Sequence, residues 1–216
     1  MTTNTLITLS RPQSPAAEAY RTLRANLHFA ALDAPFKSLV VTAPSSQEDK
    51  TTAAANLGVV LAQAEQRVVL VDADLRQPRL HTLFGLDNAA GLLDALNAAQ
   101  LEQIMQPTGV DGLSVLSSGK LPVVPSDALS SSRMTRLIQQ LETLADMVIF
   151  DTPPVLSVSD AALLASQTGG ALLVIDAGKT RREQAQAAKD VLERARARLL
   201  GAVMLNAPAD RGPNSG

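Results

Sequence analysis

The feature that most constrains the fold is a series of six short apolar runs with helix-like segments between them. In chain order the runs read SLVVTA, RVVLVDAD, LSVLSS, DMVIFDTPP, ALLVIDAG and LLGAVMLN. They are continuous rather than alternating, and this pattern is typical of strands that helices cover on both faces. Strands that alternate with helices form parallel βαβ units. The sequence therefore predicts an α/β protein with a doubly wound, mainly parallel sheet and helices on both of its faces.

Length and composition indicate one domain. A chain of 216 residues with 46% hydrophobic content can bury one sizeable core. We expect a flexible N-terminal arm over residues 1–14, a single domain over residues 15–207 and a disordered tail over residues 208–216. The domain begins with PAAEAYRTLRANLHFAAL, whose apolar residues recur at the spacing of an amphipathic helix.

Composition also excludes several classes of protein. The net charge of -2 gives no overall basic field, so we expect no nucleic-acid partner. The chain has no cysteine, so it forms neither a disulfide framework nor a thiolate metal site. It has no apolar stretch long enough to span a membrane, and its start MTTNTLITLSRPQSP does not resemble a signal peptide. We therefore expect a cytoplasmic protein without a membrane span.

The segment VVTAPSSQEDKTTAAANL has the outline of a phosphate-binding loop. Lys50 and Thr51 follow an apolar strand and open an alanine-rich helix, where a helix N-terminus and a lysine can meet phosphate. A full motif reads G-x-x-x-x-G-K-[ST], and Asp49 stands where the second glycine belongs. The pattern is also compatible with an ordinary loop that carries a surface lysine.

Three aspartates follow two other strands. Asp72 and Asp74 lie just beyond one strand and suit a Mg²⁺ site or a base for a hydroxyl proton, although they could equally be helix-capping residues. Asp151 ends the run DMVIFD, as a Walker B aspartate does. Because the carboxyl ends of parallel strands share one edge, these features are expected to meet there.

Taken together, the motifs resemble those of the bacterial tyrosine kinase family, which belongs to the P-loop NTPase-type proteins. The resemblance rests on VVLVDADLR as Walker A′, VIFDTPP as Walker B, and Glu18, Arg21 and Arg24 as an E-x-x-R-x-x-R oligomerisation motif. Outside this family context, Glu18, Arg21 and Arg24 would be expected to form a solvated helix face. The wider group of deviant-Walker ATPases includes division-site and plasmid-partition proteins, which supply an alternative function.

The resemblance implies a site for ATP and Mg²⁺. It implies catalytic roles for Lys50, Asp72 and Asp74, and metal binding by Thr51, Asp72 and Asp151. It implies nucleotide binding by Ser46, Gln47, Glu48, Asp49, Lys50, Thr51, Thr52 and Asn206, with Asn206 near the adenine.

The phosphate loop departs from the family pattern P-G-E-G-K-[ST], because Gln47 and Asp49 replace its two glycines. We expect a backbone penalty of about 1 kcal/mol at Asp49. A carboxylate roughly 4 Å from a phosphate is opposed by about 4 kcal/mol at a dielectric constant near 20. The sequence thus predicts weak ATP binding. The segment after the last strand, NAPADRGPNSG, has no tyrosine, so we expect no phosphorylation there.

The resemblance implies a cytoplasmic kinase of exopolysaccharide or capsule assembly. It would form a homo-oligomeric ring, work with a membrane polysaccharide co-polymerase and be recruited to the inner face of the membrane. If active, it transfers the γ-phosphoryl group of ATP to protein tyrosine. An alternative is a regulatory scaffold without catalysis.

Overall fold

The computed structural model of the chain describes residues 6–98, 100–120 and 125–207. In this part of the chain a seven-stranded sheet has the strand order β3-β4-β2-β5-β1-β6-β7. The strands are β1 (Ser38–Thr42), β2 (Val68–Asp72), β3 (Gln106–Pro107), β4 (Leu113–Leu116), β5 (Met147–Asp151), β6 (Ala171–Asp176) and β7 (Leu199–Leu205). The tail expected at residues 208–216 lies outside the described residues.

The sheet is parallel except at one edge. β1 lies between β5 and β6, β2 lies between β4 and β5, and all of these pairs are parallel, as is β6 with β7. The short strand β3 pairs antiparallel with β4. The six apolar runs thus form the six parallel strands, which confirms the predicted fold class. Pattern analysis missed β3, whose two residues are too few for a periodicity and whose Pro107 suits only an edge strand.

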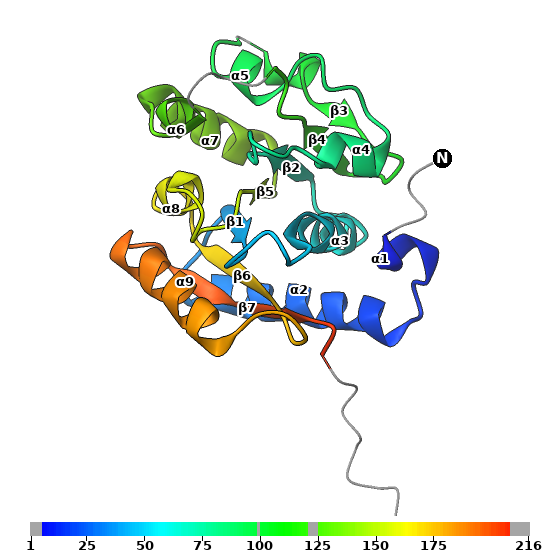
Figure 1. Ribbon diagram of the computed structural model, residues 1–216. Helices are drawn as coiled ribbons and strands as arrows, with labels where there is room; N and C mark the ends of the chain where they lie inside the picture. Colours follow the sequence, from blue (N-terminus) through cyan, green and yellow to red (C-terminus); the bar gives the residue numbers. More distant parts are fainter. Residues whose placement is uncertain (1–5, 99, 121–124, 208–216) are drawn as a thin grey trace, which may run out of the picture.

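Helices cover both faces of the sheet (Figure 1). Helices α1 to α4 pack on one face and helices α6 to α9 on the other, with α5 joining the second core. The helices are α1 (Ile7–Ser10), α2 (Pro15–Asp33), α3 (Lys50–Ala62), α4 (Leu80–Phe84), α5 (Leu92–Ala95), α6 (Pro125–Leu129), α7 (Ser132–Leu144), α8 (Asp160–Ala165) and α9 (Arg182–Arg194), with a 3₁₀ turn η2 (Leu101–Gln103).

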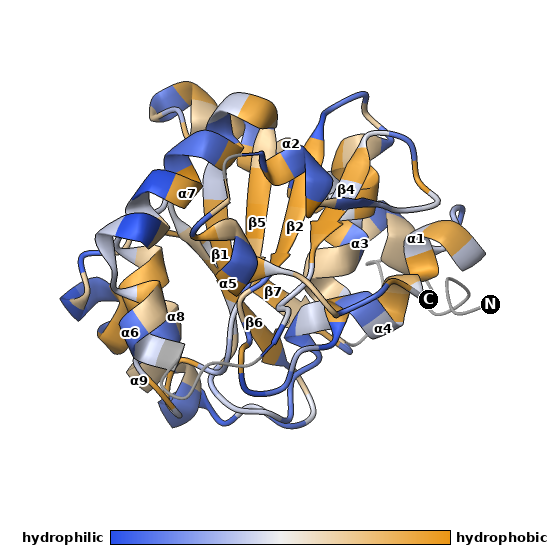
Figure 2. Ribbon diagram, turned by 90° about the horizontal axis from the view of Figure 1, so that it is seen from above, coloured by the Kyte–Doolittle hydropathy of each residue, from blue (hydrophilic) through white to orange (hydrophobic). Residues whose placement is uncertain are grey.

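The sheet separates two apolar cores. Along β5, Val148 and Phe150 face the core shared with α7 and α8, whereas Ile149 faces the core shared with α3. Figure 2 shows the central strands as hydrophobic and the outer helix faces as more hydrophilic. This two-sided burial explains why the strands read as continuous apolar runs.

Helix α3 is buried over nearly its whole length, from Lys50 to Ala62. Its small alanine side chains let it lie against β1, β2 and β5 at the centre of the sheet. A helix that is apolar all round requires such a covered position. Its first turn, with Lys50 and Thr51, is thereby fixed beside the carboxyl ends of the central strands.

The expected flexible arm differs from the structure in its described part, residues 6–14. Leu6 is fully buried, and helix α1 packs against α2 and α3. The backbone N–H and the hydroxyl of Thr8 both donate to Oδ1 of Asn56, over 3.1 and 2.8 Å. Leu6 and helix α1 are therefore part of the folded domain. A four-residue helix has no readable periodicity, so only its tertiary contacts reveal it.

None of the helices in the described ranges has the length and apolar character that a membrane crossing needs.

Candidate functional site

The carboxyl ends of β1, β2 and β5 bring the predicted reactive residues together. Asp72 and Asp151, the last residues of β2 and β5, are register partners on adjacent parallel strands. Lys50 and Thr51 reach the same edge from the start of α3. The four side chains, with Asp74, come from three separate parts of the chain.

Lys50 is held between two carboxylates. Its Nζ lies 2.8 Å from Oδ2 of Asp74 and 3.2 Å from Oδ1 of Asp151, and the residue is 6% exposed. Burial alone lowers the pKa of Lys50, but the charges and hydrogen bonds of Asp151 and Asp74 outweigh it and raise the pKa above its usual value. Lys50 is therefore charged. Thr51 donates its hydroxyl to Oδ2 of Asp151 over 2.6 Å.

Asp72 is fully buried, and within the described ranges only one of its two carboxylate oxygens has hydrogen-bond partners. Its Oδ2 accepts hydrogen bonds from the backbone N–H groups of Arg79 and Leu80, each over 2.9 Å. Its Oδ1 has no hydrogen-bond partner among the described residues. Burial, followed by the negative charge of Asp151, raises the pKa of Asp72 to about 7. A general base works best with a pKa near the operating pH, so this carboxyl group suits proton transfer.

Asp74 accepts backbone hydrogen bonds too. Its Oδ1 accepts from the N–H groups of Arg76 and Gln77, over 3.3 and 3.1 Å, while its Oδ2 faces Lys50. The sequence left two interpretations of Asp72 and Asp74 open, caps of backbone amides or reactive carboxylates. The structure shows the backbone contacts, for which each carboxylate uses one oxygen, and it leaves the other oxygen toward the site.

The phosphate loop is tied down by Glu48. Its Oε2 accepts from the N–H and the hydroxyl of Ser45, and its Oε1 accepts from the hydroxyl of Thr180 over 2.6 Å. Ser46 and Gln47 lie in the same loop, and Lys179 donates to the carbonyl of Gln47 over 3.3 Å. Sequence analysis missed Lys179 and Thr180, although both directly follow the apolar run ALLVIDAG.

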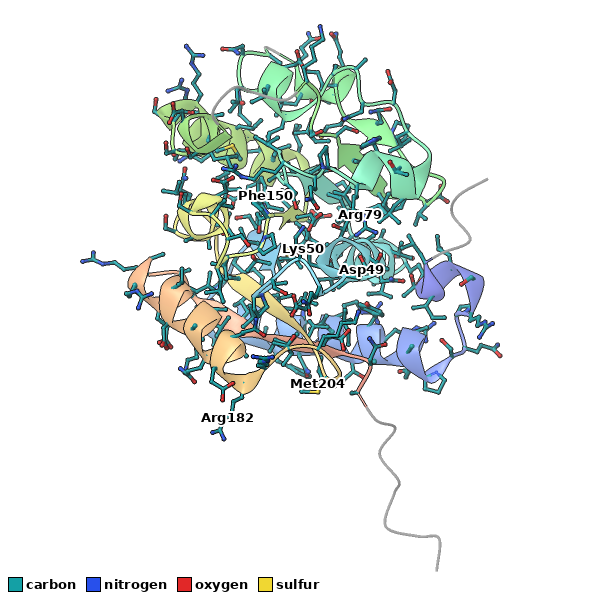
Figure 3. All side chains as sticks on the ribbon, viewed as in Figure 1. Asp49, Lys50, Arg79, Phe150, Arg182 and Met204 are labelled. Atoms are coloured by element: carbon teal, nitrogen blue, oxygen red, sulfur yellow. The ribbon has the colours of Figure 1, made fainter. Side chains whose placement is uncertain are left out.

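Asp49 does not carry the expected backbone strain. Its φ of -84° lies outside the left-handed region, and Gln47 is not among the described non-glycine residues with positive φ. The expected penalty at Asp49 is therefore wrong for this conformation. The carboxylate of Asp49 caps α3 by accepting from the N–H of Thr52, and its Oδ1 lies 3.1 Å from Nη1 of Arg79. Figure 3 shows Asp49, Lys50 and Arg79 near one another at the centre of the molecule.

Arg76 and Asp160 form a further charged pair. Nε of Arg76 donates to Oδ2 of Asp160 over 3.2 Å, and Oδ1 of this buried aspartate has no partner among the described residues. Sequence analysis singled out neither Arg79 nor Asp160. Arg79 follows Asp72 by seven residues, whereas the whole of β5 lies between Asp72 and Asp160 in the chain.

A cavity of about 900 Å³ adjoins the phosphate loop between α2, α3 and β7. Asp49 and Thr52 line it near the loop, and Asn206 lines it at the end of β7. Nδ2 of Asn206 donates to Oδ2 of Asp176 over 2.8 Å. Tyr20 also lines the cavity, and burial, followed by the charge of Asp49, raises the pKa of its hydroxyl to about 12. The size suits a nucleoside.

The three residues of the predicted oligomerisation motif lie on α2, apart from the strand ends. Nη1 of Arg21 lies 2.7 Å from Oε2 of Glu18, and its Nη2 donates to the carbonyl of Pro12. Nη1 of Arg24 donates to the carbonyl of Val60 in the last turn of α3, over 3.0 Å. Arg24 thus caps the end of α3 opposite to the phosphate loop.

The donor set fits Mg²⁺ bound together with phosphate. No group of three or more His, Asp or Glu side chains within the described ranges is arranged to hold a metal ion by itself. Mg²⁺ in phosphoryl-transfer sites usually takes one or two carboxylates, substrate phosphates and water. The hydroxyl of Thr51, the carboxylate of Asp151 and the unpaired Oδ1 of Asp72 supply oxygen ligands of that kind.

In this mainly parallel sheet, one strand leads through a loop with a lysine and a threonine into a buried helix. Aspartates at the ends of neighbouring strands lie beside that loop. This arrangement defines a P-loop NTPase-type protein. A family model described as an AAA domain matches residues 48–180. The tyrosine-protein kinase YwqD of Bacillus subtilis (strain 168) is 44% identical over 200 residues, covering 92% of this chain and 84% of YwqD. The chain belongs to the bacterial tyrosine kinase family.

Solved structures agree with this placement. The chimerical protein CapA2B2 superposes with a TM-score of 0.89 at 35% identity, over 94% of this chain and 90% of that chain. The kinase domain of the Escherichia coli tyrosine kinase ETK superposes with a TM-score of 0.87 at 33% identity, over 97% and 84% of the two chains. The cell division ATPase MinD of Pyrococcus furiosus shares the fold at a TM-score of 0.66 and 25% identity, over 78% and 71%.

Proposed function

We propose that this chain is a protein-tyrosine kinase that binds ATP·Mg²⁺ weakly and acts in exopolysaccharide or capsule assembly. The observation that carries the proposal is the half-satisfied carboxyl group of Asp72, which is buried beside Lys50 and Asp151 and has a pKa of about 7. Such a group can take a proton at neutral pH. The kinase relatives make phosphoryl transfer to tyrosine the matching reaction.

In this proposal each residue has one task. The tyrosine hydroxyl oxygen forms a bond to the γ-phosphorus, the bond from that phosphorus to the leaving ADP oxygen breaks, and the hydroxyl proton passes to Oδ1 of Asp72. Lys50 contacts the phosphates, which compete with Asp74 and Asp151 for its charge. Mg²⁺ would be held by Thr51 and Asp151 and would neutralise the charge that develops on the phosphate oxygens, while Oδ1 of Asp72 stays free to take the proton. Asp74 orients Lys50, and Asn206 borders the space for the adenine.

Weak binding is proposed because the phosphate loop carries an extra carboxylate and its lysine is already paired. Asp49 stands at the start of α3, where helix amides would otherwise face phosphate. Two of the three N–H donors of Nζ of Lys50 already face Asp74 and Asp151, so these carboxylates compete with a phosphate for its charge. The same two observations favour the second candidate, a kinase-like regulatory scaffold without turnover.

The cellular setting is part of the proposal. We infer a cytoplasmic protein that a membrane polysaccharide co-polymerase recruits to the inner face of the membrane, and that assembles into a ring through Glu18, Arg21 and Arg24. A partition or division-site ATPase remains the third candidate. The kinase identity of the similar proteins favours the first two over it.

One experiment separates the candidates. The purified chain is incubated with ATP·Mg²⁺ and a tyrosine-containing peptide, phosphotyrosine is measured, and nucleotide affinity is measured separately. We expect transfer that Asp72→Asn abolishes. The matched control is Asp146→Asn, a surface aspartate paired with Arg67 far from the site, which should leave transfer unchanged. Nucleotide binding without transfer identifies the scaffold, and ATP hydrolysis without a peptide product identifies the partition-type ATPase.

A further inference from the structure

Arg79 connects the two halves of the candidate site. Its backbone N–H donates to Oδ2 of Asp72 over 2.9 Å, which anchors it to the end of β2. Its guanidinium extends to the phosphate loop, where Nη1 lies 3.1 Å from Oδ1 of Asp49 (Figure 3). A cation is therefore positioned across the entrance to the phosphate loop from a strand end that is itself part of the site.

The charge at this entrance is unusual for a phosphate site. Lys50, the lysine of the loop, is already paired with Asp74 and Asp151. Asp49 adds a negative charge at the first turn of α3. Arg79 compensates this charge, so the segment meets a polyphosphate with less repulsion than Asp49 alone would cause.

The pair is also easy to exchange. The side chains of Arg79 and Asp49 are 53% and 49% exposed. Ion pairs in such exposed positions contribute little to stability, because water solvates both partners well. A polyphosphate offers the guanidinium fork several charged oxygens and bidentate geometry, which a single aspartate oxygen does not.

We propose that Arg79 is a further phosphate-binding residue that exchanges Asp49 for the polyphosphate when nucleotide binds. This inference rests on the proposed binding of ATP. Asp49 holds the guanidinium at the entrance in the nucleotide-free protein, so part of the cost that Asp49 imposes on binding is the loss of this pair. Arg79 then adds its charge to that of Lys50, which Asp74 and Asp151 already share.

The test is a double-mutant cycle on binding. NMR-detected titrations, which reach millimolar affinities, are run with ATP·Mg²⁺ and with adenosine as probes. The proteins are the wild type, Arg79→Gln, Arg79→Lys, Asp49→Asn and the double variant Asp49→Asn/Arg79→Gln. Arg67→Gln, which removes an exposed arginine paired with Asp146, is the matched control.

We expect Arg79→Gln to weaken ATP·Mg²⁺ binding about tenfold, Arg79→Lys to weaken it less, and both to leave adenosine binding unchanged. If Arg79 had only a structural role, its replacement would change the affinities for ATP·Mg²⁺ and for adenosine together. Asp49→Asn should tighten ATP·Mg²⁺ binding, and this gain should be about two- to fivefold larger with Arg79 present than in the Arg79→Gln background, because only then is a pair released.

Two results overturn the exchange while leaving ATP binding in place. One is an Arg79→Gln protein with wild-type affinity for ATP·Mg²⁺. The other is a gain from Asp49→Asn that is equal or larger in the Arg79→Gln background, which means that Arg79 stays on Asp49 as a counter-ion. If no protein of the set binds ATP·Mg²⁺, the proposed function itself fails and the exchange falls with it.

Discussion

Asp72 and Asp151 are register partners at the ends of the neighbouring parallel strands β2 and β5, and both are fully buried. Lys50 bonds Asp151 and Asp74 but makes no hydrogen bond to Asp72. Lys50 is therefore shared by Asp74 and Asp151, whereas burial, followed by the negative charge of Asp151, raises the pKa of Asp72 to about 7. The raised pKa of Asp72 links its reactivity to the stability of the protein.

Replacing Asp72 should raise stability at neutral and higher pH. A folded-state pKa of about 7 lies above the unfolded value of about 3.9, so the stability contributed by this group is complete below about pH 4 and is lost as pH rises through 7. Asp72→Asn keeps an oxygen for the N–H groups of Arg79 and Leu80. We expect it to raise the free energy of unfolding by about 1–3 kcal/mol at pH 8 and to have little effect near pH 4.

Urea denaturation at the two pH values checks this prediction. A variant that is less stable than the wild type at pH 8 would show that the negative form of Asp72 is not penalised by its surroundings. Asp146→Asn serves as a control of opposite sign, because hydrogen bonds from Arg67 lower the pKa of Asp146 to about 2. Its stability contribution is present at pH 8 and is lost toward acid pH.

Removing the charge of Lys50 should destabilise the nucleotide-free protein. Lys50→Met leaves the buried carboxylates of Asp74 and Asp151 without their shared cation, and breaking such a buried pair costs about 3–5 kcal/mol. The matched control is Lys189→Met, which removes an exposed lysine 3.5 Å from Glu193. This control should change stability by less than about 0.5 kcal/mol. Equal stability losses for the two variants, measured by chemical denaturation, would rule out the buried network.

Asp49 should limit affinity through its charge rather than its backbone. Because its φ is already favourable for any residue, Asp49→Asn and Asp49→Gly are both expected to tighten ATP·Mg²⁺ binding by at least about tenfold. Asn keeps the side-chain oxygen that caps α3, whereas Gly should lose a few tenths of a kcal/mol of stability. Calorimetric titration distinguishes the causes. A gain with Gly but none with Asn would assign the weak binding to steric conflict.

The arginines of α2 should govern assembly. Starting from an assembled wild type, replacing Arg21 and Arg24 with Ala is expected to give monomers by light scattering. Arg24→Ala alone should also lower stability by roughly 1 kcal/mol, because it frees the carbonyl of Val60 at the end of α3. Arg182→Ala is the control, since this exposed arginine extends from the start of α9 into solvent (Figure 3). An unchanged mass for the double variant would contradict the interface.

The N-terminal helix should depend on one buried asparagine. Asn56→Ala removes the acceptor of both the N–H and the hydroxyl of Thr8. A buried donor without a partner costs about 1–3 kcal/mol of stability. We expect a loss of about 2–3 kcal/mol and faster hydrogen exchange in α1. Exchange in α1 that matches the wild type would show that its packing does not require this contact.

Much of the fold was readable from local patterns. Each parallel strand is a continuous apolar run because both sheet faces are covered, and the alanine-rich run after Lys50 predicted a helix. The family followed from motif spacing around Asp72 and Asp151. Helix α1 and strand β3 were missed because four and two residues are too short to show a period.

The sequence by itself determined the strand order along the chain, the family and the identity of the charged residues at the strand ends. Only the tertiary structure decided how those charges are paired. Lys50 meets partners 24 and 101 positions away, and Arg79 reaches Asp49 across 30 positions. Which cation neutralises which carboxylate depends on distances of a few ångströms between separate strand ends, and a linear pattern holds no information about those distances.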